Sequence, residues 1–110
     1  MFITGCHRSG TSLITSIFKD LINEQIDESK LITPQLDNPS GFFESKKLVK
    51  FNEQLLEIIG SSCTSPPITL PLWSKPPLID ILINARKDFE DLAISNNWVD
   101  KDPRLCILYP

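Results

Sequence analysis

A glycine-bounded loop near the amino end constrains the fold of this chain more than any other feature. The sequence GCHRSGTS runs from Gly5 to Ser12 and has the G-x-x-x-x-G spacing of a phosphate-binding loop. A short apolar, β-prone run at residues 1–4 precedes the loop, and an apolar pattern of helical period follows it. Because a strand, a glycine loop and a helix in this order open a βα unit, the sequence predicts an α/β fold with a parallel sheet.

The helix expected after the loop extends from about Gly10 to Asn23. Its apolar residues recur at the spacing of one helical stripe, which is typical of an amphipathic helix. Thr11 and Ser12 stand where hydroxyl groups can satisfy the open amides of the first turn. The stripe consists of Leu13, Ile14, Ile17, Phe18, Leu21 and Ile22.

Two further helices and one strand are expected in the rest of the chain. An apolar stripe within residues 48–59 stops at Gly60, and a third helix is expected from about Leu78 to Ser95. A second strand is expected to start at Trp98–Val99 and to lead into residues 100–104. The proline-rich segment 60–77 predicts a surface loop, because proline interrupts both helices and central strands.

Composition narrows the class of protein. The chain has 110 residues and a formal net charge of −3, which predicts one small domain or part of a larger one. The acidic balance argues against nucleic-acid binding, because it offers no basic stripe. Three separated cysteines and a single histidine favour neither a metal site nor a disulfide framework. Without an apolar run long enough for a membrane span, we expect a cytoplasmic protein that does not enter membranes.

The loop differs from an ATP-binding loop at one position. An ATP-using loop carries a lysine directly after its second glycine, but Thr11 stands there in this chain. A positive charge lies instead inside the loop, at Arg8, whose planar fork of donors suits tetrahedral oxyanions. The sequence therefore predicts an anion cradle that does not hydrolyse nucleoside triphosphates.

Three segments together resemble the sulfotransferase family, in its broad sulfotransferase-like branch. They are the GCHRSGTS loop, the stretch NPSGFFE at residues 38–44, and Trp98 followed by KDPR at residues 101–104. The three come in the order that the family has, and together they span nearly the whole chain. The resemblance implies a parallel sheet of the P-loop NTPase type with flanking helices.

The resemblance also implies a donor and residues that hold it. The family uses 3′-phosphoadenylyl sulfate (PAPS) to transfer a sulfuryl group to a hydroxyl or amine acceptor, without a metal. Its members bind the 5′-phosphosulfate of the donor with the loop that corresponds here to Arg8, Ser9, Gly10, Thr11 and Ser12.

Two further residues are candidate catalytic groups by the same resemblance. Several branches of the family place a glutamate between the first two helices, so Glu44 is the candidate general base for the acceptor. Lys101 resembles the lysine near the leaving oxygen, and it is expected at the carboxyl end of a strand, where ligands sit in open α/β sheets. Arg104 is a weaker candidate for contact with donor or acceptor.

Plainer interpretations of the same residues stay open at this point. The loop is also compatible with a simple strand-to-helix turn, and His7 with a structural hydrogen bond in it. Glu44 is also compatible with a carboxylate that favours its own helix terminus. Lys101 and Arg104 are also compatible with a solvated strand end, paired with Asp100 and Asp102.

The resemblance implies the amino-terminal portion of a single sulfotransferase-like domain over residues 1–110. The family grips the 3′-phosphate of the donor with an arginine and a serine on and after a strand that would follow residue 110, so weak activity is expected. A non-catalytic module that dimerises through an exposed sheet edge is a second hypothesis, and a small-molecule kinase relative is a third. The acceptor, a carbohydrate or another hydroxyl-bearing molecule, is not specified by any residue pattern.

Overall fold

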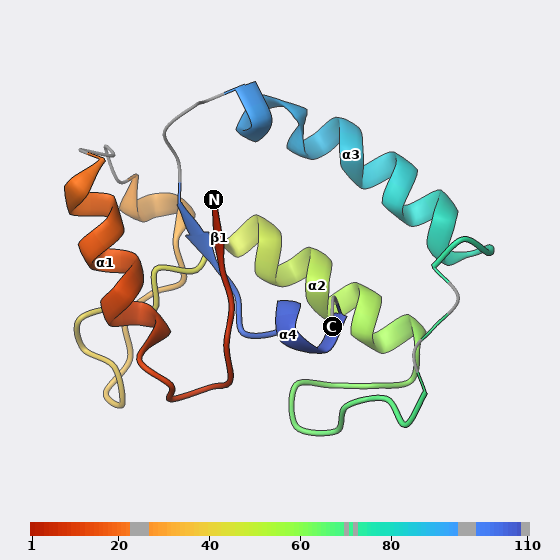
Figure 1. The fold of residues 1–110 in the computed structure, drawn as a ribbon, viewed down its shortest axis with the longest axis horizontal. Helices are drawn as coiled ribbons and strands as arrows, with labels where there is room; N and C mark the ends of the chain where they lie inside the picture. Colours follow the sequence, from red (N-terminus) through yellow and green to blue (C-terminus); the bar gives the residue numbers. More distant parts are fainter. Residues whose placement is uncertain (23–26, 70, 72, 95–98, 109–110) are drawn as a thin grey trace.

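The computed structural model describes residues 1–22, 27–69, 71, 73–94 and 99–108 of the chain. Within these residues it is a small mixed α/β structure with a two-stranded parallel sheet, as the sequence predicted at that coarse level. Figure 1 shows the sheet between α1 on one side and α2 on the other. The elements in chain order are β1 (Phe2–Ile3), α1 (Thr11–Leu21), the 3-10 turn η1 (Glu28–Lys30), α2 (Lys46–Ile58), α3 (Leu78–Ile94), β2 (Asp100–Lys101) and α4 (Leu105–Leu108).

The two strands come from opposite ends of the chain. Phe2 pairs with Asp100 and Ile3 with Lys101 in a parallel register. The N–H of Asp100 donates to the Met1 carbonyl at 3.1 Å and extends this ladder. The expected start of the second strand was too early, because the paired residues are Asp100 and Lys101; Val99 precedes them and Trp98 lies outside the described residues. The register brings the glycine loop after β1 close to the residues that follow β2.

The hydrophobic core lies on the α2 side of the sheet. Leu55 and Leu56 of α2 are 0% and 2% exposed, and they pack with Leu78 of α3 and Leu108 of α4. Partly buried apolar side chains complete this cluster. Gly60, with φ +67°, adopts the left-handed conformation that ends helices, as the sequence predicted. The helix expected at 78–95 forms as α3, although Ser95 lies outside the described residues.

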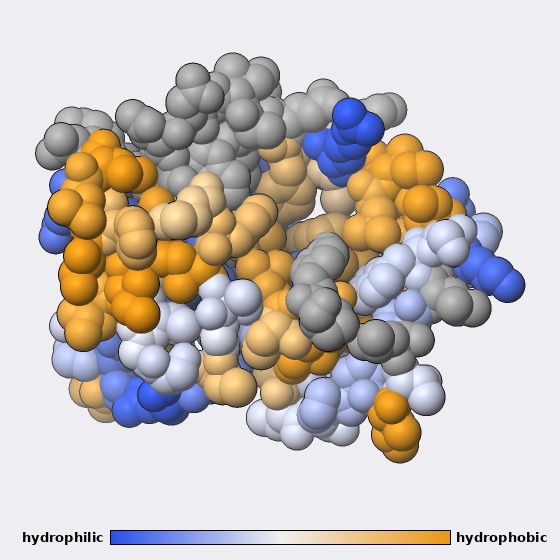
Figure 2. Space-filling view, in the orientation of Figure 1, coloured by the Kyte–Doolittle hydropathy of each residue, from blue (hydrophilic) through white to orange (hydrophobic). Residues whose placement is uncertain are grey.

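Helix α1 presents its apolar stripe to solvent. The residues that α1 buries are Thr11, Thr15 and Lys19, and it contacts the sheet through this polar face at β2. Figure 2 shows apolar side chains gathered over α1. No helix within the described ranges has the length and hydropathy needed to cross a bilayer. The exposed side chains of the stripe are Leu13, Ile14, Ile17, Phe18 and Leu21.

Candidate functional site

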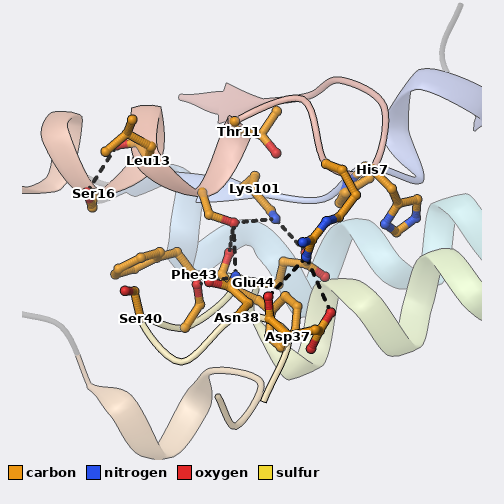
Figure 3. A pocket seen from close by; sticks show the side chains of 16 residues that line it. His7, Thr11, Leu13, Ser16, Asp37, Asn38, Ser40, Phe43, Glu44 and Lys101 are labelled. Carbon is orange, nitrogen blue, oxygen red and sulfur yellow. Dashed lines mark hydrogen bonds and ion pairs between the residues drawn. The ribbon is translucent and has the colours of Figure 1, made fainter. Parts of the chain in front are cut away.

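A pocket of about 530 Å³ opens at the amino end of α1, between the glycine loop, the loop before α2 and the end of β2. Figure 3 shows this pocket from close by. Six of the seven residues predicted for the site line it; Ser9 is the one that does not. The lining residues are His7, Arg8, Gly10, Thr11, Ser12, Leu13, Ser16, Asp37, Asn38, Ser40, Gly41, Phe42, Phe43, Glu44, Lys101 and Pro103.

The glycine loop turns sharply into α1. Arg8 and Gly10 adopt φ angles of +67° and +83°, on either side of Ser9. A Cβ at Gly5 would lie 2.9 Å from the Thr11 methyl carbon, so this close approach requires glycine. The N–H of Ser9 donates to the Cys6 carbonyl at 3.2 Å, so the loop closes a tight turn directly before α1.

The amino terminus of α1 lies at the pocket without a capping side chain. Gly10 occupies the N-cap position and provides no side-chain hydrogen bond. The first amides of a helix have no partner within the helix, and the helix dipole favours an anion there by about 0.3–1 kcal/mol at exposed sites. The pocket therefore offers an unblocked helix terminus.

Ser12 connects the first turn of α1 to the other walls of the pocket. Its hydroxyl accepts from Lys101 Nζ at 3.2 Å and from Asn38 Nδ2 at 3.5 Å, and donates to the Phe42 carbonyl at 3.4 Å. Asn38 also donates to the Gly41 carbonyl at 2.7 Å, which closes the turn of the NPSG sequence. The loop of residues 38–43 is thus held against α1 by polar contacts.

Arg8 lies at the mouth of the pocket and already has a partner. Its guanidinium donates to the Asp37 carbonyl at 3.1 Å and to the Asp37 carboxylate at 3.4 Å. Both side chains are well exposed, at 73% and 60%. Such an exposed ion pair is worth about 0–1 kcal/mol, so an anion in the pocket can compete for Arg8 at little cost.

Glu44 and Lys101 form the central ion pair of the pocket. Glu44 Oε1 lies 2.6 Å from Lys101 Nζ, and the side chains are 8% and 4% exposed. Figure 3 shows the two side chains meeting in the pocket. The residue before Glu44, Phe43, has φ +56°, a left-handed conformation that costs a bulky residue of order 1–3 kcal/mol. The burial rules out the interpretation of Lys101 as part of a solvated strand end, and Glu44 precedes the α2 cap Ser45 instead of lying in the first turn.

Arg104 extends this pair into a larger charge network. It contacts Glu44 Oε2 at 3.4 Å, Asp102 Oδ1 at 2.9 Å and Glu53 Oε1 at 2.8 Å. Asn52, fully buried on α2, donates to the second oxygen of Asp102 at 2.9 Å. Burial acts to lower the pKa of Arg104, but the charge and hydrogen bond of Asp102 outweigh it and raise that pKa above its usual value. Arg104 therefore stays a cation against the pocket wall.

Three buried charged residues of this region were not predicted as site residues. Asp100 and Asp102 on and after β2 are 8% and 0% exposed, and Lys19 of α1 is 4% exposed. Burial raises the pKa of Asp100 to about 6, against the effects of the Ser45 and Lys101 amides and of Lys19. One sequence signal was available: the DKDP pattern places two carboxylates next to the predicted lysine.

The comparisons with known proteins leave the family of the chain unassigned. No family model matches the chain, and neither the curated proteins nor the solved structures give a match. The chemical properties of the pocket therefore carry the argument. It combines an open helix terminus, a displaceable arginine and a buried lysine–carboxylate pair, a set that can bind an anion and move a proton beside it.

Proposed function

We propose that the chain binds PAPS in this pocket and transfers its sulfuryl group to a hydroxyl or amine acceptor, on a P-loop NTPase-like parallel sheet. The observation that carries the proposal is the meeting of three separate segments at one pocket: the glycine loop, Glu44 and Lys101. These are the three segments whose sequences resemble sulfotransferases, and they lie far apart along the chain.

In this proposal the first turn of α1 holds the 5′-phosphosulfate. The amides of residues 10–12 and the guanidinium of Arg8 supply donors to its oxygens, and Arg8 leaves Asp37 to do so. The N–H of Ser9, which the resemblance also implied, instead donates to the Cys6 carbonyl at 3.2 Å and closes the loop. The proposal requires no metal, as in the family that the three segments resemble.

The chemical step uses the central ion pair. The acceptor oxygen or nitrogen attacks the sulfur while the bond from sulfur to the bridging phosphate oxygen breaks, and the electron pair of that bond goes to the phosphate. Lys101, which lies 3.2 Å from the Ser12 hydroxyl, stabilises the leaving oxygen. Glu44 takes the acceptor proton once Lys101 turns toward the leaving oxygen. The products are a sulfate ester or sulfamate and adenosine 3′,5′-bisphosphate.

A thermal-shift titration with adenosine 3′,5′-bisphosphate tests the proposal. We expect the midpoint of unfolding to rise with ligand concentration in the native chain, since a ligand of the folded state stabilises it. Arg8→Ala should remove most of that rise, and Arg86→Ala on α3, away from the pocket, should leave it unchanged. An equal rise with ATP and Mg²⁺ would favour a kinase relative instead.

A non-catalytic interaction module is the second candidate, and one observation favours it. Both cations of the pocket that would act on the donor already have carboxylate partners, Arg8 with Asp37 and Lys101 with Glu44. In a module of this kind the ion pairs would serve only to hold the loops. No stabilisation by the bisphosphate at millimolar concentration would support this candidate, and self-association of the chain would then be the next property to measure.

A further inference from the structure

Asp100 is a buried carboxylate that the proposed chemical step does not use. One of its oxygens, Oδ1, accepts the backbone N–H of Ser45 at 3.1 Å and that of Lys101 at 2.8 Å. Ser45 directly follows Glu44, and Lys101 is the partner of Glu44 in the central ion pair. A single oxygen atom thus joins the two backbone segments that carry this pair.

The two hydrogen bonds alone do not require a charged group. A neutral amide oxygen would accept from the same N–H groups, and a buried carboxylate pays a cost of desolvation that the amide avoids. That cost is visible in Asp100, where burial raises the pKa to about 6. Lys19, buried on α1, opposes the rise through its charge. The charge of Asp100 therefore needs a reason beyond giving each of the two N–H groups an acceptor.

We propose that Asp100 is a positioning residue that sets the separation of the Glu44 carboxylate and the Lys101 ammonium. The charged carboxylate accepts both amides more strongly than a neutral group would, because charge-assisted hydrogen bonds are shorter and stronger. With both backbone segments fixed, the two side chains meet at 2.6 Å. The importance of this separation for catalysis rests on the proposed function, in which Glu44 acts as the base only after it has separated from Lys101.

The proposed role makes the ion pair sensitive to acid. The charged groups around Asp100 are Lys19 from α1, Asp102 and Lys101 from its own segment, and Glu44 beside Ser45. Protonation of Asp100 as the pH falls through about 6 removes the charge from the shared acceptor. The two amide contacts then weaken and the Glu44–Lys101 pair loosens. Above that pH the pair stays closed.

Reductive methylation of Lys101, followed by mass spectrometry at pH 5 to 8, measures how closed the pair is. The exposed Lys50 of α2 is the internal reference at each pH. In the native chain we expect Lys101 to be protected at pH 8 and to lose protection through about pH 6. In Asp100→Ala, Lys101 should lose its protection from methylation at every pH, by roughly tenfold if one net hydrogen bond is lost. Asp100→Asn keeps an acceptor oxygen, so it should show partial protection without the transition.

The controls separate this inference from the proposed function. Asp20→Asn, an exposed carboxylate change on α1, should behave as the native chain. The inference is wrong if Asp100→Ala protects Lys101 fully, or if Asp100→Asn keeps the transition; the second variant decides the matter if the first does not fold. Bisphosphate binding is measured on the same proteins. If methylation follows the expected pattern but no bisphosphate binds, only the proposed function fails.

Discussion

Helices α1 and α2 are both amphipathic, but α2 packs against the rest of the protein through its apolar face and α1 through its polar face. α2 buries Leu48, Val49, Leu55 and Leu56, and so builds the hydrophobic core with α3 and α4. α1 buries two threonines and a lysine and leaves its apolar stripe exposed. The two helices show that the presence of an apolar stripe does not by itself determine which face of a helix is buried; a complementary apolar surface is also needed. On the site side of the sheet, polar contacts decide the placement instead.

The buried face of α1 is suited to close contact with β2. Thr11 and Thr15 are small enough for the helix to approach the strand, and the hydroxyl of Thr15 donates to the Thr11 carbonyl at 2.7 Å. The helix therefore satisfies that hydroxyl internally and needs no partner on the sheet. Lys19, one turn further, places its charge near Asp100. α1 is thus oriented by the site that it borders.

The largest expected change in the free energy of unfolding is in the hydrophobic core beside α2. Leu56→Ala removes a side chain that is 2% exposed within the core cluster, so we expect a loss of about 2–5 kcal/mol in the free energy of unfolding. Leu21→Ala removes the same side chain from α1, where it is 70% exposed, and should change that free energy by less than about 0.5 kcal/mol. Urea denaturation of the two variants measures both.

A large decrease in the free energy of unfolding of Leu21→Ala would contradict this difference between α1 and α2. It would mean that the α1 stripe is covered in solution, for example by a second copy of the chain. Sedimentation of the native chain at two concentrations distinguishes that case from a difference in the monomer.

The sequence predicted the presence of the main helices but not the orientation of α1. Periodicity identifies a stripe from local spacing, whereas the surface that the stripe meets is set by distant residues. α4 was missed, although a signal was available. The side chain of Asp102 accepts the N–H of Arg104 and Pro103 follows it, so a carboxylate and a proline mark the turn that leads into α4.

Most of the residues that the resemblance named line one pocket, but the network that joins them was not predicted. Resemblance named Glu44 and Lys101 separately, and the structure brings them together. The DKDP pattern places two carboxylates beside the predicted lysine, but it does not show that Asp100, Asp102 and Lys19 are buried, because charged residues are expected in solvent unless partners are known. Some partners are close in sequence, such as Arg104 for Asp102, but others lie in distant segments, so a local pattern reports only part of the network.

The second-largest effect is expected at the charge that α1 buries. Lys19→Met keeps the length of the side chain but removes its ammonium from the neighbourhood of Asp100. We expect a loss of about 1–3 kcal/mol at pH 8, where Asp100 is ionised, because a buried charge loses a favourable neighbour. At pH 5 the loss should be smaller, since Asp100 is then largely protonated. Denaturation at both pH values tests this, and an equal loss would mean that Lys19 acts through packing alone.

A smaller effect is expected on the pH dependence of stability. The pKa of Asp100 is raised from 3.8 to about 6, so between these values the folded chain binds more protons than the unfolded chain. The stabilisation from this carboxyl is complete below about pH 4 and is lost as the pH rises through about 6. Asp100→Asn should lack the part of the decrease in stability that this carboxyl causes as the pH rises. Thermal melts from pH 4 to 7 check it, and identical profiles for the variant and the native chain would contradict the assignment to Asp100.

The smallest effect on stability, and the most useful one for function, is expected at the pocket mouth. Asp37→Asn removes a charge that pairs with Arg8 at 3.4 Å in solvent, so the free energy of unfolding should change by less than about 1 kcal/mol. The same change leaves Arg8 with its bond to the backbone carbonyl of residue 37 but without a charged partner there, and it removes a negative charge beside the anion pocket, so affinity for adenosine 3′,5′-bisphosphate should rise. Asp80→Asn, an exposed change on α3, is the matched control for calorimetric titration. A fall in affinity would show instead that Asp37 holds Arg8 in its binding position. The loops around the pocket would then be preorganised, as the core around α2 is.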